Sequence, residues 1–247
     1  MDNPQRYKLI ACEILFRELS YCAAQSRNII DVTFMPKGLH DMGQSKMSAR
    51  LQAEIDQTDV SQYAAILFGY GLCNNGTRGL RAPIPMVLPR AHDCITLLMG
   101  SKEKYVAYFQ DHPGTFYKSP GWIERDIDPN DNPDSVMTQL GISRSYQDYV
   151  AKYGEENARY LMDMLGDWVK HYNRIAYIDT QVSNPQAYQA QSRADAEERG
   201  WEYEEIQGSV DLLMRLLNGE WDAHDFLVIP PSQTLIPTYD DEIIGSV

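Results

Sequence analysis

Positive charge is scarce in this chain, and it contains no long apolar run. The 247 residues include 22 Lys and Arg but 35 Asp and Glu, which gives a formal net charge of −13. Such a surface repels nucleic-acid phosphates and anionic membranes, so neither is expected as a partner. The apolar stretch near the N-terminus is interrupted at Glu13, too early for a signal peptide or a membrane span. We therefore expect a cytoplasmic protein that acts on a small-molecule substrate.

Cysteine is also sparse, with four residues in the whole chain. Four cysteines in a chain of this length do not form a disulfide framework, and a reducing compartment keeps them as thiols. They then serve packing, catalysis or metal binding. The sequence has no C-x-x-C pair, which argues against a closed structural zinc site.

Apolar runs and helical patterns alternate through the first half of the chain. Strands are predicted at residues 7–12, 28–35, 63–68 and 85–88, and helices at 13–25, 45–57, from 95 onward and at 102–112. This alternation is typical of right-handed βαβ crossovers. The sequence therefore predicts an α/β fold with a mainly parallel, doubly wound (Rossmann-like) sheet. If the strand order is 2-1-3-4, the first and third strands flank the point where the order reverses.

An Asp/Asn/Pro-rich loop at residues 126–134 is the best candidate for a domain boundary. It would divide an N-terminal α/β lobe, residues 1–125, from a C-terminal helical and α/β part, residues 135–247, packed on the first. In that second part we predict two helices within 144–171, strands at 174–179, 201–206 and 226–229, helices at 185–199 and 210–217, and a Pro-rich tail. Two lobes with a helical insertion and a single domain are both open.

Three cysteines fall at the carboxyl ends of predicted strands. Cys12 ends the first strand, Cys73 follows the third and Cys94 follows the short fourth. In an open parallel sheet, ligands bind outside these ends, where the strand order reverses. Three thiols in one crevice suit a soft or borderline metal and leave one coordination position open for a substrate. We expect a metal ion there, with zinc preferred and an iron–sulfur cluster as the alternative, while Cys22 is interpreted as a core residue.

Charged residues beside these thiols are candidates for catalysis. Glu13 lies at a strand-to-helix junction, where it would act as a general acid or base or stabilise the helix N-terminus. Arg90 is a candidate for holding an anionic substrate, and His92 for a general base or an additional metal ligand. For Asp93 we favour capping of the next helix over orientation of His92.

The turn at residues 69–79 is rich in glycine but matches no phosphate-binding motif. We expect Gly71, Asn74 and Gly76 to bring the backbone close to whatever Cys73 holds, with simple turn chemistry as the alternative. Trp122 and Tyr117, in a segment rich in glycine and proline, are candidates for walls of the crevice, although aromatic residues often only pack.

Several unusual strings run through the chain. They are Ala11-Cys-Glu13 with Arg17-Glu18, Gly38-Leu-His-Asp41, Gly69-Tyr-Gly-Leu-Cys-Asn-Asn-Gly76, Pro89-Arg-Ala-His-Asp-Cys-Ile95, Pro120-Gly-Trp122, Gly219-Glu-Trp-Asp222 and Phe226-Leu-Val-Ile229. Over nearly the whole chain they resemble the domain-of-unknown-function family 1638. The resemblance implies an association with corrinoid-dependent methyltransferases and thus with one-carbon metabolism. Such methyltransferases hold zinc with a His-x-Cys and a distant Cys, and His92-x-Cys94 with Cys12 or Cys73 is similar in type.

Three hypotheses on function follow. The first is a metal-dependent enzyme, a transferase or lyase, in which a metal at Cys12, Cys73 and Cys94 acts as a Lewis acid or activates a thiolate. The second is a non-catalytic accessory module that binds a corrinoid protein or methyltransferase, or carries a metal to it. The third is a metal-free enzyme with one thiol as nucleophile and Glu13 or His92 as base.

Overall fold

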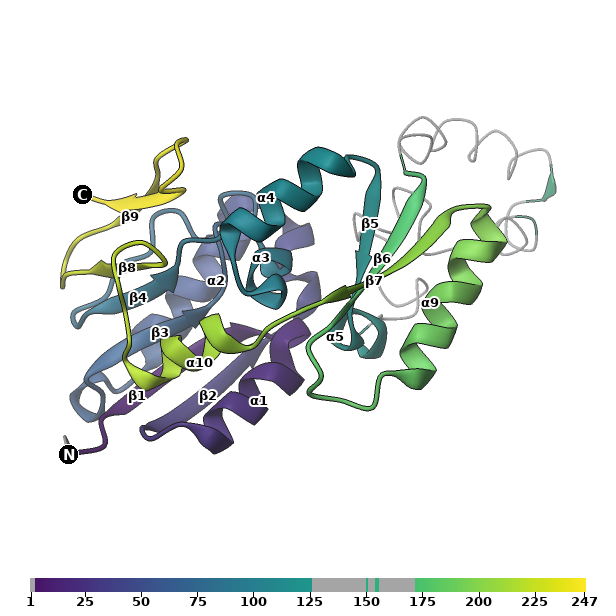
Figure 1. Ribbon diagram of the computed structural model, residues 1–247. Coiled ribbons are helices and arrows are strands. Elements are labelled where there is room, and N and C mark those ends of the chain that lie inside the picture. The colour runs from purple at the N-terminus through teal and green to yellow at the C-terminus, as the bar shows by residue number, and fades with distance from the viewer. Residues whose placement is uncertain (1–2, 126–149, 151–153, 156–171) are drawn as a thin grey trace.

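The computed structural model describes residues 3–125, 150, 154–155 and 172–247 (Figure 1). Five strands of these residues form one sheet in the order β2-β1-β3-β4-β8. Four of them are parallel, namely β1 (Arg6–Cys12), β2 (Ile29–Met35), β3 (Ala65–Gly69) and β4 (Met86–Pro89), and β8 (Phe226–Ile229) pairs antiparallel with β4. The predicted α/β class is confirmed, and the first four strands have the order 2-1-3-4.

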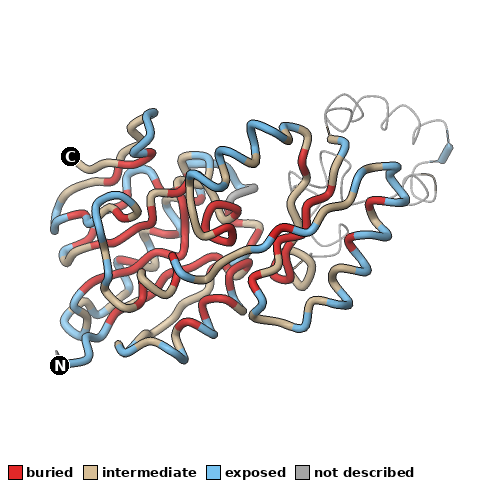
Figure 2. The backbone as a smooth tube through the Cα atoms, in the orientation of Figure 1, coloured by how far each residue is buried: buried red, intermediate tan, exposed pale blue. Residues whose placement is uncertain are grey.

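Helices cover both faces of this sheet, and each face has its own core. One face carries α1 (Phe16–Gln25), α3 (Cys94–Met99) and α10 (Asp211–Asn218), and the other carries α2 (Gln44–Gln57). Successive residues of a strand point to opposite faces, so Leu9 packs in the first core and Ile10 in the second. Burial on both faces explains why β3 and β4 are continuously apolar, and Figure 2 shows buried backbone through the centre of the sheet. The edge strand β2 is only partly buried and contains Asp31 and Thr33.

A second sheet lies beside the first (Figure 1). It has three parallel strands in the order β5-β6-β7, namely β5 (Thr115–Lys118), β6 (Arg174–Asp179) and β7 (Glu202–Gln207). Its neighbours are α4 (Lys102–Asp111), α5 (Pro120–Glu124) and α9 (Gln186–Arg199), and the remaining short helices are η1 (Glu13–Leu15), η2 (Lys37–Met42) and η3 (Val60–Gln62). Strand β5 was not predicted, because glycine and proline on both sides of four residues favour a loop.

The predicted domain boundary at residues 126–134 lies outside the described residues, as do most of residues 144–171, where two helices were predicted. Each of the two sheets nevertheless combines strands that precede residues 126–134 with strands that follow them. Strand β5 precedes this boundary and pairs with β6, which follows it, and β4 precedes it and pairs with β8. Membership of the two sheets therefore does not follow the division into residues 1–125 and 135–247.

The predicted Pro-rich tail forms an antiparallel hairpin of β9 (Leu235–Pro237) and β10 (Ile244–Ser246). Leu235 and Ile244 are fully buried in the core on the α2 side of the sheet. The C-terminal segment is thus part of the first sheet's packing. Among the described residues, no helix is long and apolar enough to cross a membrane.

A buried carboxyl group connects the two sheets. Glu18 of α1 is only 1% exposed, and its Oε1 accepts a hydrogen bond of 2.7 Å from the Thr180 hydroxyl, just after β6. Its second oxygen has no hydrogen-bond partner among the residues described. Burial raises the pKa of Glu18 above its ordinary value of 4.5, against a smaller opposite effect of the Thr180 hydrogen bond. The folded state therefore favours the protonated carboxyl group more strongly than the unfolded state does.

Replacing Glu18 with glutamine should stabilise the protein at neutral pH by about 1 kcal/mol, because the amide is neutral at every pH. In the wild type, the protonated Glu18 contributes its full stabilisation below pH 4.5, the ordinary pKa of the group. This contribution to the free energy of unfolding is lost as the pH rises through the raised pKa of the folded state. The gain from Glu18→Gln should therefore fade on acidification. Urea unfolding of both proteins at pH 7 and pH 4 measures it, and an equal difference at both pH values would contradict the prediction.

Candidate functional site

A cavity of about 850 Å³ opens at the carboxyl ends of β1, β3 and β4. Cys12, Cys73 and Cys94 all line it, and so do His92 and Asn74. Cys12 ends β1, Cys73 lies in the loop after β3 and Cys94 begins α3, and the parallel strands bring these three positions to the same edge of the sheet. The volume is in the range of sites that hold a small organic molecule.

Cys94 is the first residue of α3, and the residue before it fixes that helix end. The Asp93 carboxylate accepts hydrogen bonds from the backbone N–H groups of Ile95, at 3.0 Å, and of Thr96, at 3.2 Å. The capping interpretation of Asp93 is thus confirmed, and the cap sets where the Cys94 side chain leaves the helix.

Cys73 lies in an unusual stretch of backbone. Cys73, Asn74 and Asn75 all have positive φ angles, of 48°, 53° and 64°. Asparagine tolerates this conformation better than other residues, but cysteine does not favour it. The loop is held in place by hydrogen bonds of 2.8 Å from the Cys73 N–H to the His92 carbonyl and 2.9 Å from the Gly76 N–H to the Cys73 carbonyl. Strain kept by such contacts is typical of functional loops.

Gly71 and Gly76 serve packing within the protein. A Cβ at Gly71 would collide with the backbone of Ala91 and Asp93, and one at Gly76 would collide with the side chain of Met47. Neither glycine lines the cavity, whereas Asn74 does. The expected close approach therefore occurs, but it is made to neighbouring segments of the chain.

Burial keeps the three thiols protonated. It raises the pKa of Cys12 from 9.0 to about 11, and it raises the pKa values of Cys73 and Cys94 further. Negative charge on a neighbouring cysteine adds to the effect, since Cys12 raises the pKa of Cys73, and both raise that of Cys94.

In this structure the sulfur atoms of Cys12, Cys73 and Cys94 do not all lie close enough together to share one metal ion. Within the described part of the chain, three ligand atoms of His, Cys, Asp or Glu come within 4.8 Å of one another only at Asp222, His224 and Asp225. Sulfurs that share a zinc ion at 2.3 Å lie about 4 Å apart. Binding a metal at Cys12, Cys73 and Cys94 therefore requires side-chain rotation inside the cavity.

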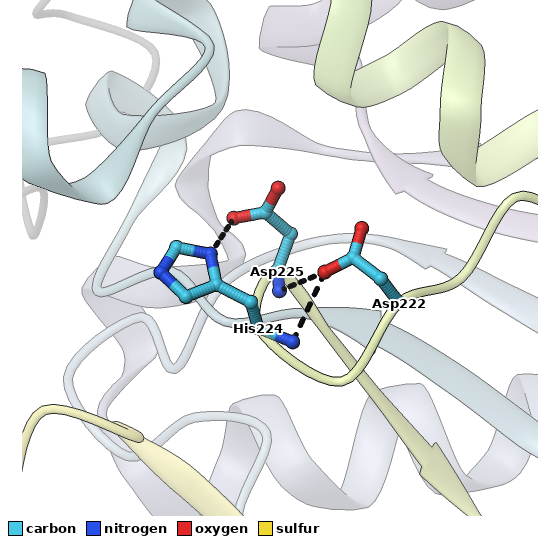
Figure 3. Close-up of side chains that lie close together, drawn as sticks. All are labelled: Asp222, His224 and Asp225. Carbon is cyan, nitrogen blue, oxygen red and sulfur yellow. Dashed lines mark hydrogen bonds and ion pairs between the residues drawn. The ribbon is translucent and has the colours of Figure 1, made fainter.

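The exposed group at Asp222, His224 and Asp225 is explained by local structure (Figure 3). The Asp222 carboxylate accepts hydrogen bonds of 3.0 Å from the backbone N–H groups of His224 and Asp225. Asp225 contacts the His224 ring at 2.9 Å, and the Arg215 guanidinium pairs with both carboxylates. Because a cation of the protein already neutralises these acids, we assign this group to the turn before β8.

Two other side chains shape the cavity. Trp122 lines it beside Cys94, whereas Tyr117 packs against Tyr105 and Tyr108 at the second sheet and does not line it. Lys37 was not predicted. It is buried, lines the cavity and lies 4.8 Å from the centre of the Trp122 ring. Its position just after a predicted strand is the same signal that selected the cysteines.

Glu13 and Arg90 lie outside the residues that line the cavity. The Glu13 carboxylate accepts a hydrogen bond of 2.7 Å from the Lys37 backbone N–H and lies 4.0 Å from the Arg125 guanidinium. Arg90 donates hydrogen bonds to the carbonyls of Ala223, Glu242 and Ile244. These contacts give both side chains a structural role, and the predicted catalytic roles gain no support from their positions.

The sequence of the chain was also compared with known proteins. The family described as "Protein of unknown function (DUF1638)" matches residues 34–217. The chain belongs to this family. Cys73, His92 and Cys94 lie within the matched residues, and Cys12 and the β9–β10 hairpin lie outside them. No curated protein and no solved structure matches the chain.

Proposed function

We propose that this DUF1638 protein is a metal-dependent enzyme, a transferase or lyase, whose metal is held by Cys12, Cys73 and Cys94. The observation that carries the proposal is that three thiols far apart in the chain line one cavity of about 850 Å³ at the carboxyl ends of β1, β3 and β4. Three protein ligands leave a coordination position open, and the cavity has room for a substrate beside it. Zinc is the preferred metal, and His92 on the same wall is available as a further ligand or as a base.

The chemistry of these residues suits a soft metal. When bound, a zinc ion would ionise the thiols and polarise an oxygen or sulfur atom of the substrate. The chain itself would supply the thiolates, largely apolar cavity walls and the Lys37 side chain on one of those walls. An iron–sulfur cluster with one open iron uses the same ligands and is distinguished by its colour.

We also infer that the five-stranded sheet is of the doubly wound, Rossmann-like type. Four parallel strands in the order 2-1-3-4 carry helices on both faces, and β1 and β3 flank the point where the strand order reverses. Ligands of such sheets bind at that point. Cys12 follows β1 and Cys73 follows β3, which is the reason for placing the reaction there.

The metal-free alternative, with a single cysteine nucleophile, is less well supported. A nucleophilic cysteine reacts as its thiolate, and burial raises the pKa of all three thiols in the cavity. Of its two proposed bases, Glu13 does not line the cavity, whereas His92 does. The accessory-module alternative and the corrinoid-linked partner stay predictions, and co-purification with a corrinoid protein would favour them.

Metal analysis tests the proposal directly. We expect the full chain, purified without oxygen and without an affinity tag that binds metals, to contain about one zinc per molecule and to be colourless. Replacement of the zinc by cobalt should give intense near-ultraviolet absorption from sulfur-to-cobalt charge transfer. Brown protein with iron and sulfide would identify the cluster, whereas protein with neither metal, before and after incubation with zinc, would refute the proposal.

A further inference from the structure

The β9–β10 hairpin forms the outer wall of the cysteine cavity. Its connecting residues contribute Tyr239, Asp240, Asp241 and Ile243 to the lining. Tyr239 is 82% exposed, which is unusual for a large aromatic side chain on the wall of a mainly apolar cavity. The hairpin joins this wall from the far end of the chain, more than 140 residues beyond Cys94.

The hairpin tip has a strained backbone. Tyr239 has a φ of +59° and Ile243 a φ of +67°. Positive φ is a marked outlier for a β-branched residue such as isoleucine. Ile243 is nevertheless buried, at 3% exposure, and its side chain lines the cavity. Such strain persists only where surrounding contacts determine the conformation.

Arg90 supplies those contacts. Its Nη1 donates hydrogen bonds of 2.9 Å to the carbonyl of Glu242 and 2.6 Å to the carbonyl of Ile244, on either side of Ile243. Its Nε donates to the Ala223 carbonyl at 2.9 Å, and the side chain is only 11% exposed. Arg90 thus ties the end of β4 to the hairpin and to the turn before β8.

The remaining walls are largely apolar. Ile14, Leu39, Met47 and Ile95 line the cavity together with Trp122. A cavity of about 850 Å³ with such walls exceeds what a metal ion and its water need, and it matches the size of an organic ligand. Aromatic side chains such as Trp122 and Tyr239 bind flat apolar groups by ring contact.

We propose that the cavity binds a small organic molecule with a flat, apolar body, which packs on Tyr239 and Trp122 while its reactive group lies at the cysteines. Arg90 is a positioning residue that holds the hairpin, and with it Tyr239, in the wall. This names the class of substrate for the proposed metal site and rests on that proposed function for the position of the reactive group.

A fluorescent dye with a flat aromatic body, 8-anilinonaphthalene-1-sulfonate, is the probe. We expect one dye molecule to bind to each molecule of the folded full chain. Tyr239→Ala should weaken dye binding about five- to tenfold through the lost ring contact. Tyr239→Phe should bind within twofold of the wild type, and Tyr21→Ala, which removes another exposed tyrosine, should leave binding unchanged.

Three outcomes would overturn the inference. They are no dye binding to the folded protein, wild-type affinity in Tyr239→Ala, and equal weakening by Tyr239→Ala and Tyr21→Ala. Arg90→Gln should also weaken dye binding. Combining it with Tyr239→Ala should weaken dye binding little further, because both substitutions act through the hairpin. Fully additive effects in that pair would rule out the positioning role of Arg90.

Zinc content separates this inference from the proposed function. Tyr239→Ala should bind zinc as the wild type does, because Tyr239 is not a proposed ligand. Dye binding without any zinc binding would refute the metal site and leave the ligand class standing. Normal zinc binding together with dye binding that does not depend on Tyr239 would refute only the proposed ligand class.

Discussion

Cys73→Ser should lower the zinc affinity of the protein by a factor of about a hundred or more, and with it any activity. The change leaves two thiols in the cavity, and a serine hydroxyl does not ionise readily enough to replace the third ligand. Serine differs from cysteine by one atom, so the loop at φ +48° keeps its shape. Competition with a chromophoric zinc chelator at fixed pH measures the loss.

Cys22→Ala is the matched control for this change. Cys22 is a buried cysteine of α1 in the core on the opposite side of the sheet from α2, and it does not line the cavity, whereas Cys73 is partly exposed and does line it. We expect wild-type zinc affinity in this variant. Wild-type zinc affinity in Cys73→Ser would contradict a site that uses three cysteines, and equal losses in both variants would indicate a general effect on folding.

Gly121→Ala should destabilise the protein by about 3 kcal/mol, the upper range for overpacking of a core. A Cβ at this position would overlap the carbonyl oxygen and carbon of Ile14, which is backbone and cannot rotate away. The only relief is a shift of α5 away from η1. That shift would carry Trp122 out of the cavity wall, so the variant should also bind the anilinonaphthalene dye more weakly.

Gly43→Ala provides the comparison for this prediction. A Cβ at Gly43 meets no atom within 4 Å, and only its φ of +83° opposes a side chain. With its ψ of 161°, this is a conformation that essentially only glycine adopts, so we expect a cost of about 2 kcal/mol there, from the backbone conformation alone. Denaturant unfolding of both variants separates the two effects, and equal stability of Gly121→Ala and Gly43→Ala would contradict the predicted overlap.

Local periodicity determined most of the elements that carry the site. The run Leu9–Cys12 is apolar throughout because this part of β1 is buried on both faces, and Met47, Leu51 and Ile55 recur at helical spacing because one face of α2 packs on the sheet. Parallel strands deliver the residues that follow them to one edge. That rule led from the sequence alone to Cys12, Cys73 and Cys94, which line one cavity.

Elements without a local pattern were the ones that the sequence did not reveal. Strand β5 has four residues between glycine and proline positions, too few to display a period, and its pairing partner β6 follows more than 50 residues later. The β9–β10 hairpin has three residues in each strand, too few to show a strand pattern, and its proline and acidic residues predict a tail. Both are stabilised by partners distant in the chain.

The sequence by itself determined the α/β class and the edge at which the cysteines lie, because both follow from periodicity and from the common direction of parallel strands. The strand order came from the tertiary structure. Only the tertiary structure decided what surrounds the cysteines. Arg90, predicted to hold a substrate, instead binds carbonyls 152 and 154 residues further along the chain. Lys37, which was not predicted, lines the cavity, whereas the predicted Glu13 does not. A side chain's partner across such distances is set by packing of whole elements, which leaves no signal in neighbouring residues.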